Sequence, residues 1–105
     1  MTTVKGISSN ELIKGNLYQV DSGFNKIKAV WGEGFWEHEQ VGAVRRNDPK
    51  WECRIPLFSI MMYAGFKSGF TKTAGLDLYK IFLFEDKIVY INSSTMQQLI
   101  FFSCY

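Results

Sequence analysis

Two stretches near the C-terminus, residues 76–84 and 87–91, carry the strongest β-strand signal in the chain. The short polar turn Glu85-Asp86-Lys87 joins them, which predicts a β-hairpin. Apolar side chains occur on both faces of the first strand: Leu78, Phe82 and Phe84 on one, and Tyr79, Ile81 and Leu83 on the other. We therefore expect a central strand, or an edge strand that another segment covers.

Shorter strand patterns precede this hairpin. Alternating side chains predict four strands, at residues 16–20, 26–31, 40–45 and 51–54. Turn chemistry at Asp21-Ser22-Gly23 and at residues 46–50 separates them. Residues 31–36 are different, because Gly32 and Gly34 lie between bulky aromatic residues, as in a bulged or sharply turning loop. Residues 67–75 contain glycines and threonines and read as a loop, with room for a short strand.

Three segments have helical character. Residues 8–15 resemble a capped helical turn that ends at Gly15. Residues 56–64 place apolar side chains at helical spacing, with Gly65 suited to the position after the helix, and the competing interpretation continues the preceding strand. Near the C-terminus, Ser94 and Gln97 match a capping box, whereas Ile100-Phe101-Phe102 favours a last strand.

These elements predict one domain over residues 1–105, since a chain of this length holds a single core. The class expected is α+β. It would be a small, curved antiparallel sheet of five or six strands, or a partly open SH3-like β-barrel, with one or two short helices. Aromatic residues make up 16% of the chain, which allows a substantial core.

Composition limits the cellular compartments and the classes of partner that this sequence favours. Lys and Arg number 12 and Asp and Glu 10, so the net charge of +2 indicates no polybasic arm. No apolar run reaches the roughly 18 residues of a membrane span, and no signal peptide is evident. Cys53 and Cys104 match no metal or redox spacing, and we expect both to be reduced and buried. The sequence therefore predicts a cytoplasmic protein that does not bind membranes.

Catalytic, cofactor and metal signatures are absent from the sequence pattern. His38 is the single histidine, and in a strand it would point away from Glu37 and Glu39. A metal site needs several convergent ligands, so we expect none. No phosphate-binding loop and no set of residues in named catalytic roles is found, which favours a protein that is not an enzyme and holds no cofactor.

Surplus aromatic surface favours a small binding module that docks on another protein and modulates it, in the manner of inhibitors and adaptors encoded by viruses or mobile elements. Aromatic and arginine side chains are enriched at protein interfaces. The residues predicted to bind the partner are Trp31, Phe35, Trp36, Arg45, Arg46 and Trp51. The apolar C-terminal segment also needs cover, which a homo-oligomer would supply.

The alternative is nucleic-acid binding through a basic and aromatic surface. Its candidate residues are Arg45, Arg46, Lys50, Trp51 and Arg54. Basic side chains would follow the backbone of a single strand while aromatic rings stack on its bases. A small enzyme of unknown reaction is the third hypothesis, and it would depend on His38.

Overall fold

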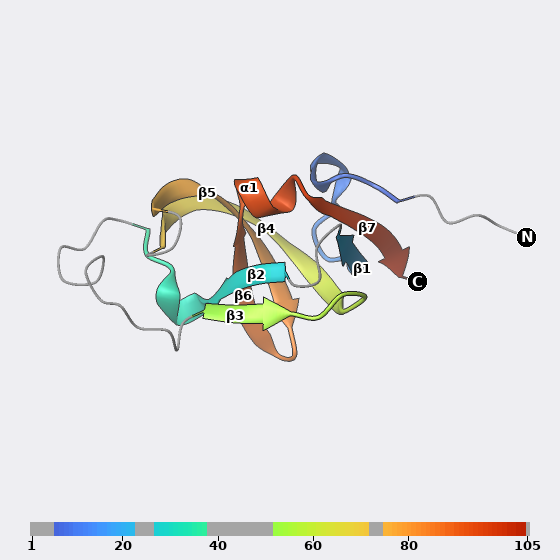
Figure 1. Cartoon of the computed structure of the whole chain (residues 1–105), viewed down its shortest axis with the longest axis horizontal. Coiled ribbons are helices and arrows are strands. Elements are labelled where there is room, and N and C mark those ends of the chain that lie inside the picture. Colours follow the sequence, from blue (N-terminus) through green and yellow to red (C-terminus); the bar gives the residue numbers. More distant parts are fainter. Residues whose placement is uncertain (1–5, 23–26, 38–51, 72–74, 105) are drawn as a thin grey trace, which may run out of the picture.

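The computed structural model describes residues 6–22, 27–37, 52–71 and 75–104, and these form one curled antiparallel sheet (Figure 1). Within them the strand order is β3-β2-β6-β5-β4-β1-β7. The strands are β1 (Leu17–Ser22), β2 (Ile27–Trp31), β3 (Glu52–Ile55), β4 (Ile60–Thr71), β5 (Gly75–Phe84), β6 (Lys87–Asn92) and β7 (Leu99–Cys104). The curved antiparallel sheet is thus confirmed, and the closer likeness to an SH3-type barrel stays a prediction.

The sheet curls around its own core. Phe82 of β5 stacks on Phe101 of β7 with ring centroids 5.6 Å apart, although β4 and β1 lie between these strands in the sheet. A flat sheet would hold such residues three strand spacings, or about 14 Å, apart. The inner face is apolar and includes Tyr18, Val20, Ile55, Val89 and Ile91, each at most 1% exposed. Burial of this face is what stabilises the fold.

The hairpin at the centre of the sheet is confirmed. β5 pairs with β4 on one side and β6 on the other, as apolar residues on both faces predicted. Phe84 pairs with Lys87, so the turn consists of Glu85 and Asp86, one residue shorter than expected. Both have positive φ, 51° and 63°, which is the geometry of a type I′ turn and matches the right-handed twist of the strands.

The helix predicted at residues 56–64 is wrong. Pro56 begins a turn in which the Ser59 hydroxyl donates to the Pro56 carbonyl at 2.6 Å, and Phe58 takes a left-handed φ of 66°. The turn is fixed to β1, because the amide of Phe58 donates to the carbonyl of Val20. β4 then alternates in burial with a period of two, which outweighs the weaker helical spacing.

The loop predicted at residues 67–75 is also wrong for most of its length, since β4 continues to Thr71 and pairs with β5 throughout. A β-bulge interrupts this pairing between Tyr63 and Gly65. Gly65 has the positive φ that the sequence indicated, 114°, but it serves the bulge and not the end of a helix. The extra residue changes which side chains face outward, so Gly65 and Gly69 lie on the outer face.

Helix is scarce in the described ranges, so the α+β class overstated it. One α-helix, α1 (Ser93–Met96), and two 3-10 turns, η1 (Ser9–Glu11) and η2 (Gly32–Gly34), are present. The turn predicted at residues 8–15 corresponds to η1, where the amide of Ser8 donates to the Glu11 carboxylate at 3.0 Å. At α1 the cap is Asn92 and not Ser94, and β7 follows, so both interpretations of the C-terminus hold in part.

The remaining strands follow the sequence closely. β1, β2 and β3 lie within two residues of the strands predicted at 16–20, 26–31 and 51–54. The strand predicted at residues 40–45 and the turn at 46–50 lie outside the described residues. No helix among the described residues is long and apolar enough to cross a membrane.

Candidate ligand pocket and apolar row on the outer face

Cross-strand pairing defines the outer face of the sheet. Residues that pair directly across an antiparallel ladder point to the same side. Leu83 pairs with Ile88, Ile81 with Tyr90, and Tyr79 with Asn92, so these side chains all point away from the core. On β2 and β3 the outward pairs are Val30 with Glu52 and Lys28 with Arg54. The outer face therefore carries aliphatic and aromatic side chains on β5 and β6 and charged side chains on β2 and β3.

Residues 32–37 fold back across the middle of this face, and we call this segment the strap. Its Phe35 ring stacks on Tyr90, with centroids 4.1 Å apart and planes 5° from parallel, and meets the Tyr79 ring edge-on at 5.3 Å. Gly69 lies beneath Phe35, where any Cβ would overlap the ring. The strap thus buries Tyr79, which is only 1% exposed although it points outward.

The backbone holds the far end of the strap. The amide of Trp36 donates to the carbonyl of Phe70 at 2.9 Å, and the reverse bond is 2.7 Å. An ion pair between Lys67 and Glu37 follows directly, and its hydrogen bond raises the pKa of Lys67. Two adjacent residues are therefore tied to β4 at the point where Phe35 enters the sheet surface.

The predicted partner-binding residues are distributed as follows. Phe35 is the half-buried ring of the strap, and Trp36 is half-buried and paired with β4 through its backbone. Trp31 packs against the core from the inner face, with the ammonium of Lys87 5.0 Å from its ring centroid. The candidates Arg45, Arg46, Lys50 and Trp51 lie outside the described residues, as does His38. Arg54 is exposed on β3.

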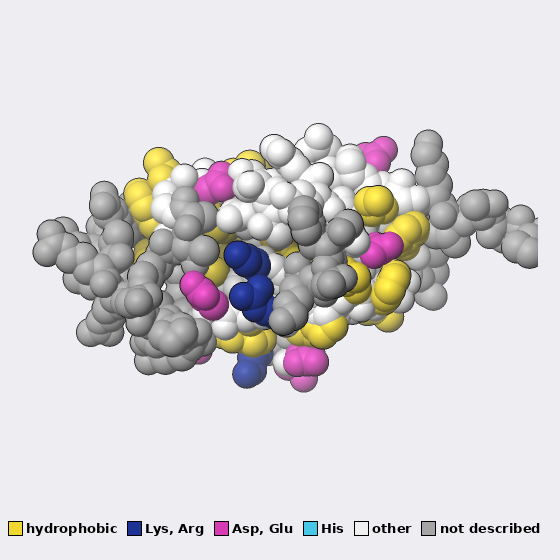
Figure 2. All heavy atoms as spheres, in the orientation of Figure 1, with side chains coloured by type: hydrophobic (Ala, Val, Ile, Leu, Met, Phe, Trp, Pro, Cys, Tyr) yellow, Lys and Arg dark blue, Asp and Glu magenta, His cyan; other side chains and the backbone are white. Residues whose placement is uncertain are grey.

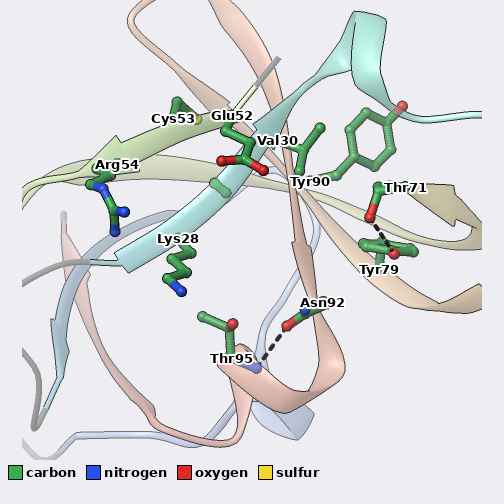
Figure 3. A pocket seen from close by; sticks show the side chains of 11 residues that line it. Lys28, Val30, Glu52, Cys53, Arg54, Thr71, Tyr79, Tyr90, Asn92 and Thr95 are labelled. Carbon is green, nitrogen blue, oxygen red and sulfur yellow. Dashed lines mark hydrogen bonds between the residues drawn. The ribbon is translucent and has the colours of Figure 1, made fainter. Parts of the chain in front are cut away.

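A pocket of about 420 Å³ opens on the outer face where β2 and β3 diverge from α1 (Figure 3). Val30 and Tyr90 line it from the sheet, and Asn92 and Thr95 line it from the start of α1. In Figure 3 the side chain of Lys28 extends toward the turn at Asn92 and Thr95. A pocket of this size suits a small organic ligand.

Two cations, Lys28 and Arg54, line this pocket. Lys28 and Arg54 pair across β2 and β3, and neither makes a hydrogen bond or ion pair within the part of the chain that the structure describes. Like charges directly opposite one another on a sheet repel. Glu52 also lines the pocket, so two cations and one carboxylate leave a formal charge of +1. Figure 2 shows Lys and Arg side chains gathered over β2 and β3.

A hydrogen-bonded pair closes the pocket beside the strap. The hydroxyl of Tyr79 donates to the carbonyl of Gly75 at 2.8 Å, so its bond of 2.7 Å to Thr71 uses the hydroxyl proton of Thr71. Burial raises the pKa of Tyr79, which keeps the phenol neutral. This pair therefore holds the ring in place and is not an acid or base for chemistry.

The cysteines are unpaired and half-buried. Burial raises the pKa of Cys53 to about 11, so its thiol stays protonated at neutral pH and is a poor nucleophile. Among the described residues, no three His, Cys, Asp or Glu side chains converge as metal ligands would. The Cys53 thiol therefore lines the pocket in its neutral form.

An apolar row crosses the outer face on the other side of the strap. We call these five residues the outer row: Leu17, Ile60, Met62, Leu83 and Ile88. Leu17 pairs with Met62, Met62 with Leu83, and Leu83 with Ile88, so the row runs unbroken over β1, β4, β5 and β6. Four of its members are 37% to 53% exposed. Four strands span about 15 Å, which makes this a continuous exposed patch.

The sequence reading missed most of this surface. Arg54 is among the predicted nucleic-acid-binding residues, but its pairing with Lys28 depends on the register of β2 and β3. Gly69 fell in a predicted loop, and Met62 and Ile60 in a predicted helix, so their common face was hidden. Residues 60–63 are all apolar, so the sequence holds no alternation there that could have shown which of them face outward.

Comparison with models of protein families, with curated proteins and with solved structures gives no match to the chain. Geometry and chemistry therefore carry the functional conclusion.

Proposed function

We propose that this chain is a small, non-enzymatic binding module that docks on another protein and modulates it. The observation that carries the proposal is the outer row, in which Met62 of β4 joins Leu17 of β1 to Leu83 of β5 and Ile88 of β6, with no charged residue among them. Apolar patches of this kind on a folded protein are typical of interaction sites. An inhibitor or adaptor role in the cytoplasm would follow from such docking.

The strap supports this interpretation by contrast. Its Phe35 ring covers Tyr79 and Tyr90, whereas Leu83 and Ile88 stay 37% and 50% exposed even though Gly32 of the strap lies beside Ile88. A second molecule would supply the missing cover. Trp36 at the edge of the strap, together with Trp31, Arg45, Arg46 and Trp51, stays a candidate for the rim of the same interface, where polar and aromatic contacts surround an apolar centre.

The test is the double substitution Leu83→Thr with Ile88→Thr, which places a strand-favouring β-branched side chain at both positions while removing apolar surface. The matched control is Phe66→Thr, since Phe66 is 63% exposed on β4 beyond the bulge and lies outside the outer row. Each variant is immobilised and incubated with lysate from the source of the sequence. Proteins retained by the wild type and the control are then compared with those retained by the double variant.

Loss of one defined protein from the double variant alone would support docking through the outer row, provided that circular dichroism shows an unchanged fold. Light scattering of the purified protein identifies self-association as that partner if the wild type is dimeric and the double variant monomeric. Retention of the same proteins by all three forms would overturn the proposal. The apolar row would then be surface without a role in binding.

A further inference from the structure

We propose that the pocket between β2, β3 and α1 binds a small phosphate monoester, with the phosphate held between Lys28 and Arg54. This site is separate from the outer row and does not depend on the proposed docking function. Lys28 and Arg54 occupy opposite positions on neighbouring strands and line the same pocket. Their mutual repulsion is relieved when an anion lies between them.

Every further polar side chain on the α1 side of the pocket offers a hydrogen-bond donor. The side-chain oxygen of Asn92 accepts from the amide of Thr95 at 2.8 Å, and this cap leaves the NH₂ group of Asn92 to donate. The hydroxyl of Thr95 makes no hydrogen bond with the chain's described residues. An ammonium, a guanidinium, an amide and a hydroxyl therefore line one pocket, from β2, β3, β6 and α1 (Figure 3).

A phosphate monoester fits this donor set better than a carboxylate. Its three terminal oxygens accept hydrogen bonds in different directions and carry close to two negative charges at neutral pH, whereas a carboxylate has two coplanar oxygens. Arginine and lysine together are the residue types that bind phosphate in proteins.

The volume of about 420 Å³ exceeds what an inorganic ion fills, so the ligand has an organic body. Val30 and the ring of Tyr90 provide an apolar surface for it beside the phosphate position. Tyr90 is held flat by its stacking on Phe35, at an interplanar angle of 5°. A rigid aromatic wall of this kind suits a planar or apolar group.

Substitution of Glu52 should change the affinity for the ligand in the opposite direction to substitution of Lys28 or Arg54. It lines the same pocket and lies on the outer face two residues from Arg54. Its carboxylate opposes an anion, so Glu52→Gln should tighten binding by about threefold, while Lys28→Gln and Arg54→Gln should each weaken it by about tenfold. Thr95→Val removes only the hydroxyl and should weaken binding by about threefold. Lys14→Gln, an exposed lysine remote from the pocket, is the matched control.

The experiment is isothermal titration of the full chain at low salt with three probes: phenyl phosphate, adenosine 5′-monophosphate and glucose 6-phosphate. Phenol, adenosine and glucose are the unphosphorylated controls. We expect saturable one-to-one binding of at least one monoester, at least tenfold tighter than its control, with the order of variants given above. Circular dichroism of each variant shows that the fold is retained.

Three outcomes would overturn the proposal. The first is no saturable binding of any of the three monoesters up to millimolar concentration. The second is binding that Lys14→Gln weakens as much as Lys28→Gln does, because that would be a general charge effect. The third is binding of a mixed single-stranded oligonucleotide that is far tighter than any monoester and falls steeply with salt, which would assign these cations to a nucleic-acid surface. A Leu83→Thr and Ile88→Thr variant should bind the monoester normally, which separates this test from that of the docking function.

Discussion

The strap and the outer row lie on the same face of the sheet, but side chains beneath the strap are covered and those of the outer row are exposed. Under the strap, Tyr79 and Tyr90 are covered by Phe35, which reaches the sheet because Gly69 leaves room for its ring. Farther along the same strands, Leu83 and Ile88 remain 37% and 50% exposed, although Gly32 of the strap lies beside Ile88. Both regions are apolar, so hydrophobicity alone does not decide which one the chain covers.

The difference lies in what holds each cover in place. The strap is fixed by paired backbone hydrogen bonds between Trp36 and Phe70 and by the ion pair between Lys67 and Glu37. The outer row is a run of apolar side chains, and the described residues form no equivalent anchor over it. Cover inside the chain thus coincides with specific polar contacts, whereas the uncovered region offers only apolar area. That is the expected division between a structural contact and a surface available to a partner.

Removing the ring of the strap should have the largest effect. We expect Phe35→Ala to lower the free energy of unfolding by about 3 kcal/mol, because it removes a half-buried ring with one stacked and one edge-on neighbour. Urea denaturation followed by circular dichroism measures the change. Phe66→Ala is the control, since Phe66 is 63% exposed and its loss should cost less than about 1 kcal/mol.

The close packing of Gly69 beneath the Phe35 ring allows a second test of the same contact. Gly69→Ala alone should cost about 2 kcal/mol, because the added Cβ overlaps Phe35 and would lie 2.6 Å from the carbonyl oxygen of Trp36. In the Phe35→Ala background the added cost should be smaller, since one of the two overlaps has gone. Additive costs in this double-mutant cycle would show that the strap does not rest on Gly69.

A smaller effect is expected at the hydroxyl of Tyr79. We expect Tyr79→Phe to cost about 1 kcal/mol at pH 7, since the bonds to Gly75 and Thr71 are lost while the ring stays. Because burial raises the pKa of Tyr79, its stabilising contribution is full below the unfolded pKa of about 10 and is lost as the pH rises through the folded pKa. The stability difference between wild type and variant should therefore shrink in alkaline solution. A difference that is constant with pH would show that the hydroxyl is open to solvent.

Local patterns in the sequence predicted most of the strands and little of the surface. The hairpin of β5 and β6 was predictable because alternation and a polar turn lie within a few residues of each other. The helix expected at residues 56–64 failed because Met61, Tyr63 and their neighbours satisfy both periods, and only pairing with β1 and β5 favours the strand. Long-range pairing of this kind leaves no local mark.

The sites depend on register even more than the strands do. Phe35 was recognised as unusual from its neighbouring glycines, but its contact with Gly69 joins residues 34 positions apart in the chain. The bulge between Tyr63 and Gly65 exchanges inward and outward positions along β4, so alternation counted through it assigns the second half to the wrong face. The pairing of Lys28 with Arg54 likewise follows from the register and not from either strand alone.

The smallest effect should come from the outer row itself, and adjacent residues of β6 provide the comparison. Ile88 is 50% exposed on the outer face, whereas Val89 is fully buried on the inner face. Ile88→Thr should change the free energy of unfolding by less than about 0.5 kcal/mol. Val89→Thr has almost the same shape as the wild-type side chain but buries a hydroxyl, and it should cost about 2 kcal/mol. Urea denaturation of both variants at one protein concentration measures the pair. A large loss at Ile88 that shrinks as the protein is diluted would instead mean that the row is covered by a second copy of the chain, because dilution dissociates the wild-type assembly and removes its added stability.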